Sequence, residues 1–320
     1  MGALALSWMA VISVSMMSNA VQAATVVNTV SYVNGVLGIG RCGAQNSDLQ
    51  TGSETQSIAF SASAAGCNVG AASFAGGGVV GLRGSNDVNS GAGRGISGVS
   101  GFAETIINGL SLSAAAGFTM GQLVTLYGNT IEVGLTPSLG ASVAAQIAPG
   151  DTLFVREGRA DLTASTFLRG SGGDRDDAFA RNIVDVNNVT TGPSESIIFT
   201  QPPTLSVMVD VNGLFGVTFR LSGVSAALGY GDTSVNSNFL AFNSLGFSST
   251  GPAFVLPEGF TVHAPEVGIV DNMWTDSRQP TPVPLPASLP LMLMGIAGIA
   301  GFGALRRRKV QRLALQMIRA

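Results

Sequence analysis

The segment LSVMVDVNGLFGVTFRL, from Leu205 to Leu221, decides the fold class of this chain. On both sides of Asn212-Gly213, apolar residues recur at every second position, at Leu205, Val207, Val209 and Val211 and then at Phe215, Val217, Phe219 and Leu221. A period of two is typical of a β-strand with one buried face. Asn-Gly between two such runs is the strongest short-range signal for a hairpin turn. The segment therefore predicts two antiparallel strands joined as a β-hairpin.

Other short runs of strand-forming residues occur along the chain, with turn-forming residues between them. They span residues 25–33, 104–112, 122–127, 130–135, 152–155, 196–200 and 260–263. No long helical periodicity stands beside them. The pattern predicts a mainly β protein, with an antiparallel β-sandwich-like body. A Gly-rich β-solenoid is the alternative, although no fixed repeat period is found.

Two segments of the body have unusual composition. Residues 57–101 are rich in Gly, Ala and Ser, which indicates either a loosely ordered loop region or a sheet of small residues. The stretch from Arg169 to Arg181 is the most charged of the body. It predicts an exposed loop.

The net charge of −3 is the sum of two opposite parts. Residues 24–282 contain 10 arginines and 19 acidic residues, so their charge is 10 − 19 = −9, whereas residues 306–320 carry six cations. Nucleic-acid binding requires a basic surface that neutralises phosphates. The acidic body therefore excludes nucleic acid as an expected partner.

The first residues resemble a secretory signal peptide. Residues 3–17 are apolar apart from three serines, and Val21-Gln22-Ala23 fits the small-residue cleavage rule. We expect cleavage after Ala23 and export of the body. An uncleaved membrane helix is the alternative. No Lys or Arg precedes the apolar run, so either the amino terminus alone supplies the charge or translation starts upstream.

A second apolar segment lies near the other end. Residues 287–305 are 19 residues long, with Ser288 as the only polar one. As a helix they would span about 28 Å, close to the ~30 Å hydrocarbon core of a bilayer. The cations Arg306, Arg307, Arg308 and Lys309 follow directly, and they predict that this end faces the cytoplasm. That orientation agrees with an exported body. A buried core helix is the alternative, and the flanking cations disfavour it.

The pentapeptide before this span carries a family resemblance. Val283-Pro284-Leu285-Pro286-Ala287, then one apolar span and an Arg cluster, resembles the VPLPA variant of PEP-CTERM sorting signals, over about 27 of 320 residues. Exosortases recognise such tails in Gram-negative bacteria that make exopolysaccharide. The resemblance implies a transient inner-membrane anchor, cleavage near Pro286 and Ala287 by an exosortase-type membrane protease, and delivery to the cell surface or extracellular matrix. A permanent C-terminal anchor is the alternative. Residues 256–272 are similar to the closing strand pair that precedes such tails.

These features predict five regions. They are a signal peptide at 1–23, an exported β-rich body at 24–278, a proline-rich spacer with the start of the sorting motif at 279–286, a transmembrane helix at 287–305 and a basic cytoplasmic tail at 306–320. Positions 310, 313, 314, 317 and 318 of the tail form one apolar stripe. They indicate either a short amphipathic helix on the inner leaflet or a frayed tail.

Cys42 and Cys67 are the only cysteines. Exported proteins commonly form disulfides, so we expect these two to pair. A bond closing a loop of about 25 residues stabilises by roughly 3 kcal/mol in the chain-entropy account. Buried free thiols are the alternative.

The body contains few residues in patterns typical of catalytic or metal-binding sites. His263 is the only histidine, and no G-x-S-x-G nucleophile elbow accompanies it. Asp174, Asp176 and Asp177 are a candidate Ca²⁺ site because Ca²⁺ takes oxygen ligands. Their spacing fits neither an EF-hand loop nor a calcium-binding nonapeptide, so a solvated charged loop is favoured. We expect no cofactor and no other metal site.

The sequence favours a non-catalytic surface or matrix protein with a structural or adhesive role in an exopolysaccharide or biofilm setting. Its expected partners are the exosortase, inner-membrane lipid and exopolysaccharide. A secreted carbohydrate-active enzyme is the alternative, and it would need two carboxylates about 5–10 Å apart. Against that alternative, Trp274 is the only tryptophan outside the predicted signal peptide.

Overall fold

The computed structural model describes residues 26–37, 45–52, 55–64, 66–89, 93–148, 156–187, 192–197, 204–211, 213–231 and 233–276. All of these residues belong to one compact unit. Within this described part, no helix has the length and apolar character needed to cross a bilayer. The predicted span at 287–305 lies outside it.

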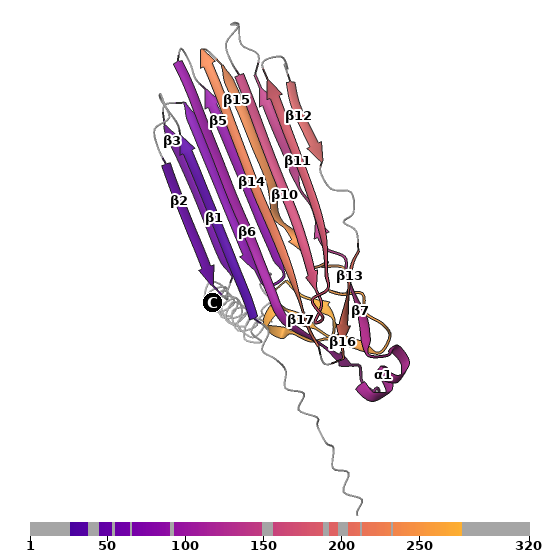
Figure 1. Ribbon diagram of the computed structural model, residues 1–320. Coiled ribbons are helices and arrows are strands. Elements are labelled where there is room, and N and C mark those ends of the chain that lie inside the picture. Colours follow the sequence, from indigo (N-terminus) through magenta and orange to yellow (C-terminus); the bar gives the residue numbers. More distant parts are fainter. Residues whose placement is uncertain are drawn as a thin grey trace, which may run out of the picture. The chain divides into compact units, whose positions relative to one another are not determined.

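Two antiparallel sheets of seven strands each form most of the body (Figure 1). Sheet A has the order β11 (Arg175–Asn187), β10 (Arg156–Arg169), β14 (Leu214–Gly231), β6 (Gly93–Ala114), β1 (Val26–Leu37) and β2 (Gln45–Gly52), with β16 (Phe260–Val262) paired to β6. Sheet B has the order β12 (Gly192–Ile197), β9 (Ser142–Ile147), β15 (Ser234–Gly246), β5 (Val79–Asn89), β4 (Cys67–Gly76) and β3 (Gln56–Ala64), with β8 (Ser138–Leu139) paired to β15. The prediction of a mainly β body with antiparallel sheets is confirmed.

The two sheets lie face to face, with β14 against β5 and β15, and β6 against β4 and β5. Alternation along each strand divides the side chains between core and solvent. In β10, Ala160, Leu162 and Leu168 are buried, whereas Arg159 and Asp161 on the other face reach solvent. For each sheet, we call the face that points away from the other sheet its outer face.

The described residues between 57 and 101 lie mainly in β3, β4, β5 and the first part of β6, so the small-residue sheet is the correct one of the two predicted alternatives. Two of its glycine positions explain the composition. Phe239 of β15 is 1% exposed, and its ring lies over Gly84 of β5 and Gly223 of the facing strand β14. A Cβ at Gly223 would lie 2.6 Å from the Phe239 ring. The glycines therefore make room for an aromatic ring between the sheets.

A buried polar network also crosses the core. Asn86 Nδ2 on β5 donates to Ser225 Oγ on β14 at 2.7 Å, and Ser225 Oγ donates to the Ser237 carbonyl on β15 at 2.8 Å. Ser237 Oγ in turn donates to the carbonyl of Arg159 on β10. Buried polar groups are costly unless paired, so this network favours one alignment of the two sheets.

The opening segment forms two strands but no hairpin, so that prediction is wrong in its pairing. β13 (Leu205–Asp210) and β14 follow each other across a turn in which Gly213 N–H donates to the Asp210 carbonyl at 2.6 Å. β13 pairs with β7 (Thr130–Leu135) in a separate two-stranded sheet. β14 pairs with β6 from Leu214 onward and with β10 from Gly216 onward, so from Gly216 both of its edges are taken and β13 has no free edge to join there.

Two further predictions are corrected. Residues 122–127 belong to the helix α1 (Met120–Tyr127) and not to a strand. Thr119 and Gln122 form a capping box, with Gln122 N–H donating to Thr119 Oγ1 at 3.3 Å and Thr119 N–H donating to Gln122 Oε1 at 3.0 Å. Most of the stretch from Arg169 to Arg181 lies in β10 and β11. β11 is an edge strand of sheet A, where charged side chains are common because they discourage pairing with other chains.

The other predicted strands divide into three groups. Residues 130–135 coincide with β7, and the segments 104–112 and 260–263 overlap β6 and β16. Residues 25–33 and 196–200 overlap β1 and β12 in their described parts. Residues 152–155 lie outside the described residues.

One end of the body is closed by α1, β7, β13, β16, the 3₁₀ turn η1 (Pro265–Val267), β17 (Ile269–Val270) and β18 (Met273–Trp274) (Figure 1). β17 and β18 pair as a closing strand pair, slightly beyond the predicted segment 256–272. Trp274 Nε1 donates to the carbonyls of Gly77 at 3.2 Å and Val267 at 3.1 Å. The Trp274 ring packs against Phe247 at a centroid distance of 6.0 Å. This tryptophan therefore fastens the last described strand to the turn between β4 and β5.

Candidate ligand-binding face

All of the predicted targeting residues lie outside the described residues. These are Ala23, Val283, Pro284, Leu285, Pro286, Ala287, Arg306, Arg307, Arg308 and Lys309. The sorting signal and the signal-peptide cleavage stay predictions.

Cys67 is the first residue of β4, is 1% exposed and takes part in a disulfide. Its predicted partner, Cys42, lies outside the described residues. The chain has no third cysteine.

We expect mass spectrometry of the exported protein to find a peptide in which Cys42 and Cys67 are linked. Reduction should lower the free energy of unfolding by roughly 3 kcal/mol, because the unfolded chain gains loop entropy. A Cys67→Ala variant serves as the control, since its stability should not respond to the reductant. Two free thiols in exported material would contradict the pairing.

The three aspartates of the candidate Ca²⁺ site do not converge. Asp176 accepts a hydrogen bond from Ser206 N–H at 2.8 Å. Asp177 is the next residue of β11, so it points to the opposite face, where its carboxylate lies 3.8 Å from Arg175. Asp174 lies in the exposed turn before β11. Throughout the described part of the chain, no three His, Cys, Asp or Glu residues are arranged to hold a metal ion.

His263 lies just after β16, with Nδ1 3.7 Å from Asp271 Oδ1. Both side chains are exposed, and the contact is an ion pair only when His263 is protonated. Neither residue lines the two hollows described below.

The outer face of sheet A gathers most of the arginines whose side chains the structure describes. Five of these seven lie there on three adjacent strands, namely Arg159, Arg169, Arg175, Arg181 and Arg220. Strand register brings them together because directly opposed residues of antiparallel strands share a face. The charged stretch from Arg169 to Arg181 was visible in the sequence. The register that aligns it with Arg220 was not.

Two of these arginines form close ion pairs with carboxylates of the same face. Arg181 makes a bidentate contact with Asp161, with N–O distances of 3.1 and 2.6 Å. This hydrogen bonding, together with the charge of Asp161, raises the pKa of Arg181 above its ordinary value. Arg220 pairs with Glu104, whose side chain is largely buried at the sheet surface.

A hollow of about 420 Å³ lies on this face, and we call it hollow A. It is lined by Ile106, Asn108, Phe167, Arg169, Arg175, Gly216, Thr218 and Arg220. Gly216 lies at an irregularity in the pairing of β14 with β6. A Cβ at Gly216 would lie 2.7 Å from Asn108 Oδ1, so only glycine leaves this floor open.

An aromatic ring supports the arginines of hollow A. The Arg175 guanidinium lies 4.3 Å from the centroid of the Phe167 ring. Arg220 lies 5.9 Å from the same centroid and 5.5 Å from that of Phe102. Cation–π contacts of this kind hold guanidinium groups in place while leaving their N–H donors available.

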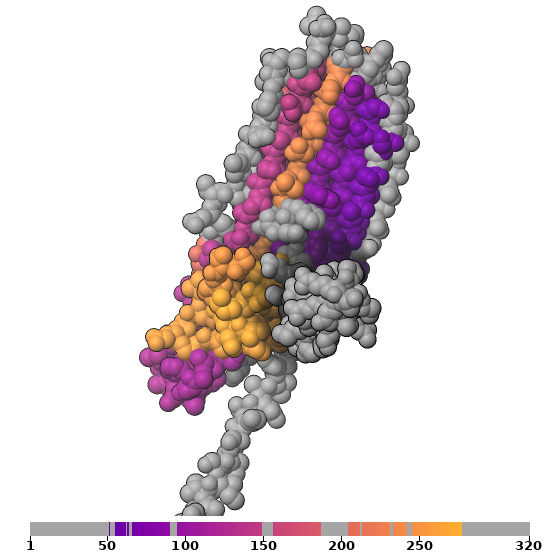
Figure 2. All heavy atoms as spheres, turned by 180° about the vertical axis from the view of Figure 1, so that it is seen from behind, coloured from indigo at the N-terminus to yellow at the C-terminus, as the bar shows by residue number. Residues whose placement is uncertain are grey.

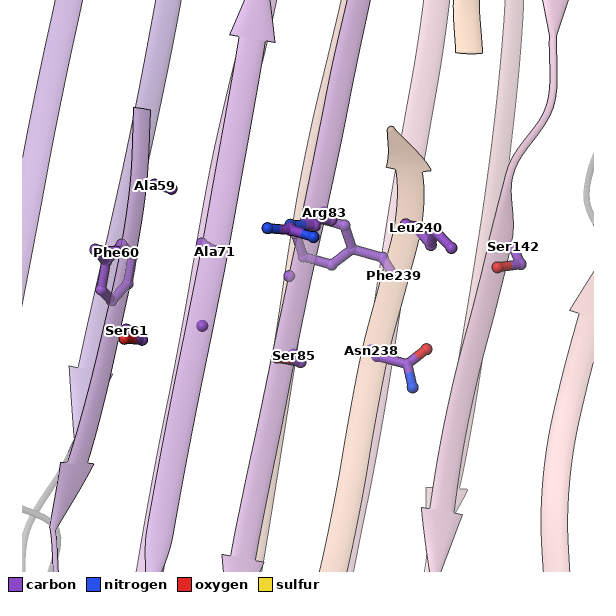
Figure 3. Close-up of a pocket in the computed structure, with 12 residues that line it drawn as sticks. Ala59, Phe60, Ser61, Ala71, Arg83, Ser85, Ser142, Asn238, Phe239 and Leu240 are labelled. Carbon is purple, nitrogen blue, oxygen red and sulfur yellow. The ribbon is translucent and has the colours of Figure 1, made fainter. Parts of the chain in front are cut away.

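A second hollow, hollow B, of about 590 Å³ lies on the outer face of sheet B. Seen from behind in Figure 2, the orange strand β15 runs beside the purple strands β3 to β5 of this sheet. Figure 3 shows the side chain of Arg83 in the middle, among small residues such as Ala71 and Ser85 and larger ones such as Phe60 and Leu240. The lining residues are Ala59, Phe60, Ser61, Gly70, Ala71, Arg83, Gly84, Ser85, Ser142, Asn238, Phe239 and Leu240. This hollow offers hydroxyl and amide groups with one cation.

Neither hollow has an Asp or Glu among its lining residues. A glycosidase of the usual kind needs two carboxylates flanking the bond that it cleaves. These two hollows therefore do not supply that pair.

No family model matches this chain, and searches of the curated proteins and of the solved structures found no similar protein.

Proposed function

We propose that this chain is an exported surface or extracellular-matrix protein with a structural or adhesive role, carrying a VPLPA-type sorting tail. The observation that carries the proposal is the order of motif, apolar span and cations near the C-terminal end. In this proposal the signal peptide directs export, and the span holds the protein in the inner membrane until a membrane protease cleaves it.

Local chemistry of the motif supports recognition by a protease. Pro284 and Pro286 lack backbone N–H donors and restrict the residues before them to extended conformations. In this proposal the proline-rich residues 279–286 act as a stiff spacer between the folded body and the apolar span. An extended peptide without regular backbone pairing can enter a protease cleft.

The body supports the adhesive part of the proposal. Its two antiparallel sheets expose broad outer faces, and each of these faces carries a hollow lined by hydrogen-bonding groups. Ligand-binding sites need a small number of hydrogen-bonding groups of this kind to hold and orient the ligand.

Deleting residues 283–320 tests the sorting tail. We expect the truncated body to lose its association with the cell surface and to be mislocalised, because both the membrane anchor and the motif are removed. Fractionation and immunoblotting of export-competent cells that make exosortase would measure this.

Deletion of only residues 310–320 is the matched control. It keeps the motif, the apolar span and the cations, so sorting should persist. Unchanged processing of the full chain in cells without the sorting enzyme would overturn the proposal and favour a permanent anchor.

A further inference from the structure

We propose that hollow A binds the carboxylate of an acidic saccharide, such as a uronate residue of a polysaccharide. The choice of a polysaccharide as the molecule that carries this carboxylate rests on the proposed adhesive function. It concerns the body alone, and it does not depend on export or on the sorting tail.

The first support is a pair of neighbouring arginines with only one exposed carboxylate paired to them among the described residues. Arg169 and Arg175 are directly opposed across β10 and β11, and both are exposed. Like charges in this position repel each other. Arg169 has no ion pair with any residue of the described part of the chain, and the carboxylate of Asp177 near Arg175 is 52% exposed and 3.8 Å away. An anion placed between the two guanidinium groups would relieve the repulsion.

The second support is the geometry of the donors. A guanidinium group presents N–H donors in a planar fork that matches a carboxylate. Phe167 holds Arg175 from one side by the 4.3 Å contact, which restricts the group before a ligand arrives. Less conformational freedom is then lost on binding.

The third support is the rest of the lining. Ile106 and Phe167 offer apolar surface for the C–H groups of a sugar ring, while Thr218 and Asn108 offer hydrogen-bonding groups for its hydroxyls. The volume of about 420 Å³ lies within the usual range for small-molecule sites. Such a mixture of apolar and polar surface fits a sugar acid better than inorganic phosphate.

Charge outside the hollow limits the ligand further. The predicted body carries 10 − 19 = −9 charges, so a densely charged polyanion would be repelled over most of its length. A uronate polysaccharide carries at most one carboxylate on each sugar ring, with hydroxyls beside it, so its charge is less dense than that of a polyphosphate. This favours a uronate polysaccharide over a polyphosphate.

The test is a calorimetric titration of the full-length protein in neutral detergent micelles with tetragalacturonate. We expect binding that weakens with added salt, as charge pairing requires. Arg169→Gln and Arg175→Gln should each reduce the affinity about 10- to 100-fold, as expected for the loss of a charge-assisted hydrogen bond. Circular dichroism should show unchanged folding, since both side chains are exposed.

Arg181→Gln is the matched control. It removes one exposed arginine from the same face of β11, but Arg181 lies outside hollow A and is paired with Asp161. Its affinity should stay within about twofold of the wild type, because a paired surface charge contributes little at a distance.

Four results would overturn the proposal. They are the absence of tetragalacturonate binding, equal binding of neutral tetragalactose, inorganic phosphate binding as tightly as tetragalacturonate, and an equal loss in Arg181→Gln. The third would define a general anion site and the fourth a diffuse charge effect. All of them leave the sorting proposal untouched, because the titration involves neither export nor cleavage.

Discussion

Replacing Phe239 with alanine is expected to lower the free energy of unfolding by about 3–5 kcal/mol, the usual cost of removing a buried aromatic ring. The ring is 1% exposed and fills the space between β5 and β14 above two glycines, Gly84 and Gly223. Neither glycine can fill the cavity, since neither has a side chain. Chemical denaturation followed by circular dichroism would measure the change.

Leu240→Ala is the control for this variant. Leu240 is the next residue of β15, is 48% exposed and should cost no more than about 0.5 kcal/mol. A comparable loss in both variants would show that the ring has no special place in the core.

A double substitution tests the same packing. Gly223→Ala should destabilise the wild type, because its Cβ would lie 2.6 Å from the Phe239 ring. In the Phe239→Ala background that cost should vanish, since the atoms nearest to this Cβ all belong to Phe239. Additive costs would contradict the contact.

Replacing Trp274 with alanine is expected to cost about 3–5 kcal/mol as well. Its indole is 7% exposed, donates to two carbonyls and packs against Phe247. The loss should be concentrated at the end of the body, so amide exchange should rise first in β17 and β18. Denaturation curves and hydrogen-exchange mass spectrometry would measure the two effects.

Trp274→Phe separates the ring from its hydrogen bonds. It keeps much of the aromatic packing but leaves the carbonyls of Gly77 and Val267 without the indole donor, so we expect a loss of about 1–3 kcal/mol. Met273→Ala, at a 49% exposed neighbour, should change stability by no more than about 0.5 kcal/mol. If Trp274→Ala left the amide-exchange protection of β17 and β18 unchanged, the proposed role of Trp274 in holding this end of the body would be contradicted.

The location of many strands could be predicted from the sequence, because alternation is a local property. Residues 130–135 coincide with β7, and both halves of the segment Leu205–Leu221 are strands. The helix α1 was missed although Thr119 and Gln122 have the spacing of a capping box. Its residues 122–127 also read as a β-forming run, and a run of that length is ambiguous between strand and helix.

The binding face could not be predicted because it depends on register. Arg169, Arg175 and Arg220 come from three strands, and Arg220 lies 45 positions beyond Arg175 in the chain. Only the pairing of β10 with both β11 and β14 brings them onto one face. A shift of one residue in that pairing would turn one set of side chains to the other face of the sheet.

The sequence by itself determined that the body is made mainly of β-strands and that its net charge is negative, because alternation and composition are read residue by residue. It did not give the lengths of the strands, which reach 22 residues in β6. The tertiary structure decided which strands pair. β13 joins β7 and not β14, since both edges of β14 are taken by longer partners. Partner choice depends on the whole set of competing edges and buried faces, and no local pattern such as Asn212-Gly213 contains that information.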